Sequence, residues 1–163
     1  MRAIAAVLGL LLALVASAAA QRLTPTDVRL VEDFIDTPHV LFGRTRASVE
    51  RALGAPSSVR TLGRPGGDGE ALDELTYPGL RLDVSARTTT VRRLEITEPR
   101  WTLPRGLNVG TPRSVIETIL GEAQRVSDGS AFYTYADGFP NTVEFYFREG
   151  RVQRIEWRYA PAD

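Results

Sequence analysis

A short amphipathic helix with a readable start and stop is the feature that most constrains the fold of this chain. In residues 110–121, GTPRSVIETILG, Thr111 can serve as the N-cap and Pro112 suits the first helical position, where its missing N–H costs nothing. Gly121 can adopt the left-handed conformation that ends a helix. One apolar stripe lies between these signals: Val115, Ile116, Ile119 and Leu120. The segment therefore predicts a helix with one face against a core.

The same pattern occurs earlier, in residues 43–54, GRTRASVERALG. Besides the flanking glycines, the two segments share three pairs in register: Arg46/Arg113, Glu50/Glu117 and Leu53/Leu120. The similarity extends beyond the helices, because residues 91–96, VRRLEI, align with residues 152–157, VQRIEW. An internal repeat of this kind predicts two copies of one supersecondary unit, with Leu53 and Leu120 buried at matching positions.

Strand-like segments with period-two alternation follow each predicted helix. Leu82 and Val84 alternate with Arg81 and Asp83, which is the pattern of a half-buried antiparallel strand. The predicted strands are residues 74–77, 80–85 and 91–97 in the first half and 132–135, 142–148 and 152–159 in the second. The predicted fold class is α+β: two tandem repeats, each a helix followed by an antiparallel meander, with the helices on one face of the sheet.

The remaining segments complete the predicted organisation. Val28, Val31 and Ile35 indicate a leading helix, which Pro38 is expected to break. The segment from Gly54 to Tyr77 is longer than the segment from Gly121 to Tyr135. The glycine-rich loop 61–71 is therefore interpreted as an insertion in the first repeat. Trp101, in the proline-bounded linker, is expected to pack at the junction. The predicted divisions are a signal peptide at 1–20, a leading segment with repeat 1 at 21–104, and repeat 2 at 105–163.

The first twenty residues have the composition of a secretory signal peptide. Arg2 precedes an apolar run, and small residues end at Ala20, before Gln21. An uncleaved membrane anchor is the alternative, although the apolar run is shorter than a spanning helix requires. The sequence has no cysteine, so neither a disulfide nor a lipidated cysteine is available. The expected location is periplasmic or secreted, without membrane insertion after cleavage.

Charge and catalytic residue types argue against several function classes. The 20 basic residues balance 20 acidic ones, so nucleic acid is not an expected partner. His39 is the only histidine, and we expect it to be a packing or surface residue rather than a metal ligand or catalytic base. The glycine-rich residues 66–69 lack a phosphate-binding lysine. We therefore expect no cofactor, no metal and no catalytic residue.

One enzymatic alternative stays open, namely a carboxylate-using envelope hydrolase acting on cell-wall glycans. Such chemistry needs two acids that face each other across a pocket. Acidic residues do cluster at two places in the sequence: Asp27, Glu32, Asp33 and Asp36, and then Glu70, Asp73 and Glu74. Acids at such positions usually belong to solvated surfaces, so the enzyme remains the second hypothesis.

The repeated unit, helix plus meander ending in an aromatic residue, resembles the tandem fold of β-lactamase-inhibitor-like proteins and the related SmpA/OmlA outer-membrane-assembly lipoproteins. The matching parts are residues 43–56 with 75–96, and 107–121 with 133–159. The lipidated cysteine of the assembly lipoproteins is absent here. The resemblance implies a non-enzymatic envelope protein, an assembly or scaffold factor or an inhibitor of an envelope enzyme, whose sheet contacts another envelope or secreted protein.

Strand alternation predicts which residues form that contact. Six residues should face the helices: Val143, Phe145, Phe147, Ile155, Trp157 and Tyr159. Eight residues on the opposite face form the expected protein-binding site: Arg81, Arg93, Glu144, Tyr146, Arg148, Arg154, Glu156 and Arg158. Arginine and tyrosine are enriched at binding hot spots, so Tyr146, Arg148 and Arg154 are placed at its centre. A merely solvated face is the alternative, and the loop 61–71 is the second candidate surface.

Overall fold

The computed structural model describes residues 28–63, 70–127, 129–134 and 140–161. Its helices are α1 (Val28–Phe42), α2 (Arg46–Leu53) and α3 (Arg113–Leu120), with a 3-10 turn, η1 (Pro104–Gly106). Its strands are β1 (Ser58–Leu62), β2 (Leu72–Tyr77), β3 (Leu80–Ser85), β4 (Val91–Ile96), β5 (Arg125–Ser127), β6 (Ser130–Thr134), β7 (Thr142–Arg148) and β8 (Arg151–Arg158). The predicted signal peptide and residues 64–69 of the predicted loop lie outside the described residues. None of the described helices combines the length and apolar character needed to cross a membrane.

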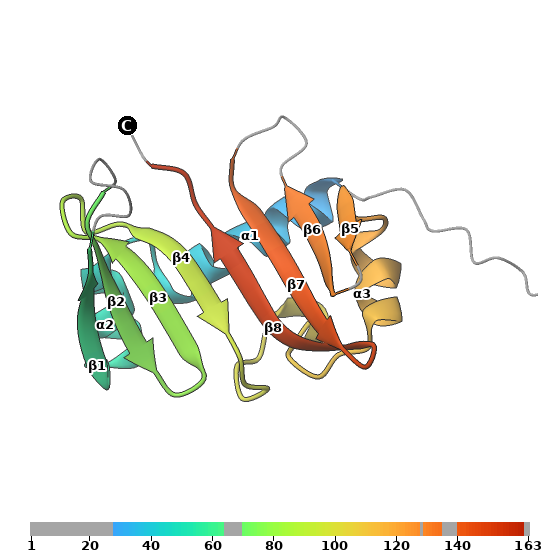
Figure 1. Ribbon diagram of the computed structural model, residues 1–163, viewed down its shortest axis with the longest axis horizontal. Coiled ribbons are helices and arrows are strands. Elements are labelled where there is room, and N and C mark those ends of the chain that lie inside the picture. The colour runs from blue at the N-terminus through green and yellow to red at the C-terminus, as the bar shows by residue number, and fades with distance from the viewer. Residues whose placement is uncertain (1–27, 64–69, 128, 135–139, 162–163) are drawn as a thin grey trace, which may run out of the picture.

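All eight strands form one antiparallel sheet that does not close, in the order β1-β2-β3-β4-β8-β7-β6-β5 (Figure 1). Strands β4 and β8 pair at its centre and join the two halves of the chain. The prediction of an α+β fold with an antiparallel sheet is confirmed. Strands β1 and β5 were not predicted, because both lie at sheet edges, where exposure on both faces removes the alternating apolar pattern.

The core lies between the sheet and α1, which crosses behind the middle of the sheet in Figure 1. The Phe34 ring lies 5.5 Å from the Phe145 ring and 5.6 Å from the Trp157 ring, measured between centroids. Of the six residues predicted to face the helices, five are buried: Val143, Phe145, Ile155, Trp157 and Tyr159. The sixth, Phe147, is half-buried and lies under the Arg113 guanidinium of α3.

Helix α1 continues through Pro38 to Phe42, so the predicted break was wrong. A proline inside a helix leaves a carbonyl of the preceding turn without its donor. For Pro38 this is the Phe34 carbonyl, and the Trp157 indole of β8 donates to it at 3.1 Å. The Tyr159 hydroxyl, one residue after β8, donates to the neighbouring Ile35 carbonyl at 3.0 Å. Tertiary contacts therefore stabilise a helix that local sequence predicts to end.

Helix α3 begins one residue later than predicted, with Pro112 rather than Thr111 at the N-cap. The Thr111 hydroxyl is used in the preceding turn, where it donates to the Gly106 carbonyl at 2.9 Å and accepts from the Asn108 N–H at 3.0 Å. Pro112 is instead held by an antiparallel bridge to Arg151. The stop at Gly121 is as predicted, with the glycine N–H bonded to the helix.

The two repeat helices bury different amounts of surface. Leu120 is completely buried, whereas Leu53 is only half-buried, so the prediction of matching burial was wrong. Ala52 of α2 stands where α3 has Ile119, which packs against the core, whereas Val115, aligned with Ser48, is itself exposed. Less apolar cover around Leu53 leaves part of its surface exposed.

Trp101 packs in the linker between the two halves, as expected. Its ring meets Phe42 edge-on at 5.7 Å between centroids, and its indole N–H donates to the Pro78 carbonyl at 3.0 Å. The linker is thereby fastened both to the end of α1 and to the turn between β2 and β3.

Candidate functional site

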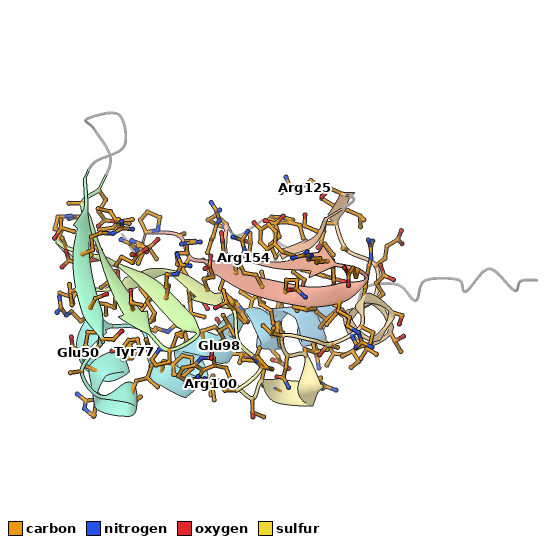
Figure 2. All side chains as sticks on the ribbon, turned by 60° about the horizontal axis from the view of Figure 1, so that its bottom comes forward. Glu50, Tyr77, Glu98, Arg100, Arg125 and Arg154 are labelled. Atoms are coloured by element: carbon orange, nitrogen blue, oxygen red, sulfur yellow. The ribbon has the colours of Figure 1, made fainter. Side chains whose placement is uncertain are left out.

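The sheet face opposite the helices carries a network of ion pairs, which we call the charged face. It consists of Arg81, Asp83, Arg93, Glu95, Glu144, Tyr146, Arg154, Glu156 and Arg158. Cross-strand pairing places four of these in one row, in the order Arg81, Glu95, Glu156 and Glu144. Figure 2 shows Arg154 on this side, with the helices on the other. Within the described residues no helix covers this face.

Two glutamates at the centre of the charged face are almost completely buried: Glu95 is 3% exposed and Glu156 is 2% exposed. The Arg93 guanidinium lies between them, with Nη2 at 2.5 Å from Glu95 Oε2 and 2.8 Å from Glu156 Oε2. Its Nη1 lies 3.5 Å from Asp83 Oδ2. One arginine therefore contacts three carboxylates, which would be costly to bury without a cationic partner.

In this arrangement the pKa values of Glu156 and Asp83 shift in opposite directions. Burial works to raise the pKa of Glu156, but hydrogen bonds and charge from Arg93 and Arg158 outweigh it and lower that pKa. Burial prevails at Asp83, whose pKa is raised despite the nearby Arg93. Asp83 Oδ1 is also buried without a hydrogen-bond partner among the described residues. Glu156 is therefore held ionised, whereas Asp83 is the acid least well compensated.

Above these carboxylates lies an outer layer of arginines. Arg158 is 64% exposed at its side chain and places Nη2 at 2.6 Å from Glu156 Oε1. Arg81 is 50% exposed and Arg154 35% exposed, and each has a nitrogen 3.5 Å from a Glu95 oxygen. The buried acids thus hold guanidinium groups in place at the surface.

Tyr146 extends this layer onto β7. The Arg154 guanidinium carbon lies 3.7 Å from the centre of the Tyr146 ring, a cation–π contact, and the tyrosine hydroxyl donates to Glu144 Oε2 at 2.8 Å. Burial, followed by the hydrogen bond to Glu144, raises the pKa of Tyr146. The Tyr146 side chain is therefore held by Arg154 on the face of its ring and by Glu144 at its hydroxyl.

The structure brings together seven of the eight residues predicted for the site. Arg148 is the exception, because it lies at the end of the β7–β8 hairpin opposite Arg151 and has no ion pair with the described residues. Asp83 and Glu95 were not among the predicted site residues, although alternation already placed them on this face. Only the pairing of β4 with β8 shows that both acids share Arg93 with Glu156.

The other acids considered for catalysis are used in separate contacts. Glu70 accepts hydrogen bonds from the Arg92 guanidinium and the Ser85 hydroxyl, which lower its pKa. Asp73 pairs with Arg46, and Glu74 with Arg60. Asp27 lies outside the described residues. Among the side chains described, no three His, Cys, Asp or Glu residues gather in a way that could hold a metal ion.

His39 lies inside the last turns of α1 as a packing residue. Its ring stacks on Tyr159 with centroids 3.9 Å apart, and its side chain is 8% exposed. Burial first, and then the charge of Arg44, lower the pKa of His39 from 6.5 to about 4, although Asp36 partly offsets them. His39 is therefore neutral at physiological pH.

Acidification should destabilise the fold through this histidine. The unfolded chain takes up the proton near pH 6.5 and the folded chain near pH 4, so the stabilisation is complete above pH 6.5 and is lost as the pH falls towards 4. The loss should reach about 3 kcal/mol. Urea unfolding at several pH values measures it, and His39→Phe, which retains an aromatic ring against Tyr159, should flatten the curve. Parallel curves for the two proteins would contradict the expectation.

Comparisons with known proteins show likeness of fold only. No protein-family model matches the sequence, and no curated protein matches it. A DUF4309 family protein (YjgB) from Bacillus subtilis is similar with a TM-score of 0.49 and 17% identity, over 82% of this chain and 97% of that one. A candidate β-lactamase inhibitor protein from Streptococcus mutans is similar with a TM-score of 0.30 and 16% identity, over 76% and 87%. Likenesses this weak assign neither a family nor a function.

Proposed function

We propose that this chain is an exported, non-enzymatic protein-binding module of the cell envelope, either an assembly or scaffold factor or an inhibitor of an envelope enzyme. The charged face is the proposed binding surface. The observation that supports it is the layer of exposed arginines and Tyr146 held over buried carboxylates, on a sheet face that no described helix covers. Periplasmic or secreted location is part of the proposal, and it rests on the composition of residues 1–20.

Pre-organisation is the physical reason why this face suits binding. A long side chain that becomes immobilised on association loses rotamer entropy, which weakens the complex. Here Arg154 already rests on Tyr146 and contacts Glu95, so much of that loss occurs on folding instead. Arginine and tyrosine are also the residue types that contribute most at interface centres. A merely solvated face does not require two glutamates to be buried beneath it.

The charged face favours a partner with acidic or hydrogen-bond-accepting groups. A guanidinium carries five N–H donors, and the ion pair of Arg81 with a described residue, Glu95, uses Nη2. Arg158 uses Nε and Nη2 on the same oxygen of Glu156. The side chains of both arginines are at least half exposed, and each has N–H donors that these contacts do not use. A partner could therefore pair with them without breaking the network beneath.

We further propose that the fold consists of two tandem repeats related by a pseudo-two-fold axis. Each repeat would be a helix followed by four strands, which agrees with the order of elements and with the sheet order. The axis would pass between Glu95 and Glu156, which are equivalent in the aligned sequences and directly opposed across β4 and β8. On this proposal the charged face is built around the junction of the repeats.

Matching side-chain contacts support the two repeats. The Tyr77 hydroxyl donates to the Gly54 carbonyl at 3.1 Å, and the Tyr133 hydroxyl to the Gly121 carbonyl at 3.2 Å. Tyr133, rather than Tyr135, thus corresponds to Tyr77. An ion pair within each helix matches as well: Arg46 Nε to Glu50 at 2.8 Å, and Arg113 Nε to Glu117 at 2.7 Å.

The binding proposal predicts a loss of partner capture when Tyr146 and Arg154 are both changed to alanine. A photo-crosslinking amino acid at position 142, which lies opposite Arg158 on β7 and is not one of the charged-face residues, should capture one dominant envelope protein in cells. We expect the double variant to reduce this yield at least about tenfold, because it removes two central contacts. The measurement is crosslinked product by mass spectrometry, with far-UV circular dichroism to show that the variant is folded.

A matched control is available at the outer edge of the sheet. Arg125 and Phe132 form a second cation–π contact, with the guanidinium carbon 4.5 Å from the ring centre. Changing both to alanine removes a contact of the same type at a position far from the centre of the charged face, and this change should leave partner capture unchanged. Equal capture by wild type and a folded Tyr146/Arg154 variant would overturn the proposed surface and direct attention to the loop 61–71.

A carboxylate-using hydrolase acting on cell-wall glycans is the second candidate function, and Asp83 is the observation that favours it. A buried acid with a raised pKa and an unpaired oxygen can act as a general acid. Release of soluble fragments from purified peptidoglycan, abolished by Asp83→Asn, would support this function. No release by the wild-type protein would leave the binding proposal in place.

A further inference from the structure

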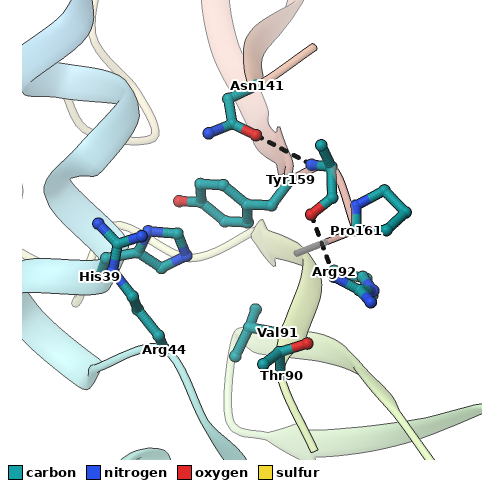
Figure 3. A pocket seen from close by; sticks show the side chains of 9 residues that line it. His39, Arg44, Thr90, Val91, Arg92, Asn141, Tyr159 and Pro161 are labelled. Atoms are coloured by element: carbon teal, nitrogen blue, oxygen red, sulfur yellow. Dashed lines mark hydrogen bonds between the residues drawn. The ribbon is translucent and has the colours of Figure 1, made fainter. Parts of the chain in front are cut away.

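A cavity of about 170 Å³ lies between the end of α1, the start of β4, Asn141 just before β7 and residues 159–161 just after β8 (Figure 3). His39 and Arg44 line one side of it, Thr90 and Val91 the floor in this view, and Tyr159 and Pro161 the remaining walls. The cavity is distinct from the charged face, because Tyr159 and Val91 belong to the core on the helix side of the sheet. Both halves of the chain contribute to it.

The walls of this cavity are largely apolar and are held rigidly. Val91 and Tyr159 are buried, at 4% and 7% exposure. Arg92 is 8% exposed and fastens the far wall, with Nε donating to Glu70 at 2.9 Å and Nη1 to the Ala160 carbonyl at 3.0 Å. The Ala160 N–H in turn donates to Asn141 Oδ1 at 2.9 Å. A preformed apolar space of this kind needs little rearrangement to receive a ligand.

Two polar groups at one side of the cavity are suited to an anion. Arg44 is exposed and forms no ion pair with the described residues, unlike Arg92, whose donors are occupied. His39 Nδ1 is buried without a hydrogen-bond partner in the described part of the chain. The Asp36 carboxylate lies 3.8 Å from Nδ1, which is beyond hydrogen-bond distance. Neutral His39 has one N–H donor in either tautomer, and it lines the same side of the cavity as Arg44.

We propose that this cavity binds a small amphipathic carboxylate, with an apolar body of about the size of a benzene ring between Val91, Tyr159 and Pro161 and the carboxylate on Arg44. The size is appropriate, since an apolar cavity of about 150 Å³ is known to accept benzene. Arginine is suited to the charged end, because its guanidinium matches a carboxylate through two parallel hydrogen bonds.

Benzoate is the probe that tests this site. Titration of the isotope-labelled protein, followed by amide chemical shifts in NMR spectra, should show saturable binding with shifts at residues 90–92, 159 and 160. Arg44→Gln should weaken benzoate binding at least about tenfold, the loss expected for one charge-assisted contact. Ala160→Leu, which fills the space from the opposite wall, should also abolish it. Arg51→Gln removes an exposed arginine elsewhere and should leave binding unchanged.

Benzyl alcohol, which has the ring without the negative charge, tests the apolar part of the site separately from the contact with Arg44. Its binding should be weaker than that of benzoate in the wild type and should not change in Arg44→Gln. Unsaturable shifts with benzoate, or equal affinity in wild type and Arg44→Gln, would overturn the site. The Tyr146/Arg154 double variant should bind benzoate like the wild type, so this result is independent of the proposed protein-binding surface.

Discussion

Leu120→Ala is expected to lower the free energy of unfolding by about 2–5 kcal/mol, the range for truncating a fully buried leucine. Leu120 has no exposed surface and belongs to the core cluster, together with Ile116 of the same helix. Removing its side chain leaves a cavity in this core, and the surrounding residues relax only partly into such a space. Chemical denaturation with a two-state fit measures the change, provided that the m-value is preserved.

Leu53→Ala is the matched control for this prediction. Leu53 occupies the aligned position of the first repeat helix but is half-buried, so less apolar surface is removed from contact with the core. Its effect should be clearly smaller than that of Leu120→Ala. Equal losses at the two positions would show that the difference in burial between α2 and α3 does not exist in solution.

Arg93→Met is expected to destabilise the protein by about 3–5 kcal/mol, the cost of breaking a buried ion pair by removing one partner. The substitution leaves Glu95, Glu156 and Asp83 close together without the guanidinium that contacts all three. Methionine fills a similar volume, so the effect should come from charge rather than from a cavity. Unfolding by urea near neutral pH measures the change.

The pH dependence of that loss identifies its cause. Arg93 lowers the pKa of Glu156 and works against burial at Asp83, so in Arg93→Met both acids should take up protons at higher pH, and the difference from wild type should shrink on acidification. Arg158→Gln is the control, because the side chain of Arg158 is 64% exposed and its pair with Glu156 should contribute no more than about 1 kcal/mol. A loss for Arg93→Met that stays constant with pH would point to packing instead of electrostatics.

The sequence by itself determined the local elements and the faces that they bury. The stripe from Val115 to Leu120 and the stop at Gly121 predicted α3, and alternation along 142–148 and 152–159 predicted which side chains enter the core. Alternation also placed Arg93, Tyr146 and Glu156 on one face. These features could be predicted because helix and strand periodicity depend on residues close in sequence. Edge strands β1 and β5 lack that periodicity and were therefore missed.

Only the tertiary structure decided how the two halves meet and what their meeting creates. Local sequence predicts that Pro38 ends α1, but the Trp157 indole, more than a hundred residues away, satisfies the Phe34 carbonyl that the proline leaves free. Alternation places Glu156 on the outer face, yet the pairing of β4 with β8 buries it beneath Arg93. Burial and ion pairing depend on contacts between distant segments, and such contacts leave no periodic pattern in the sequence.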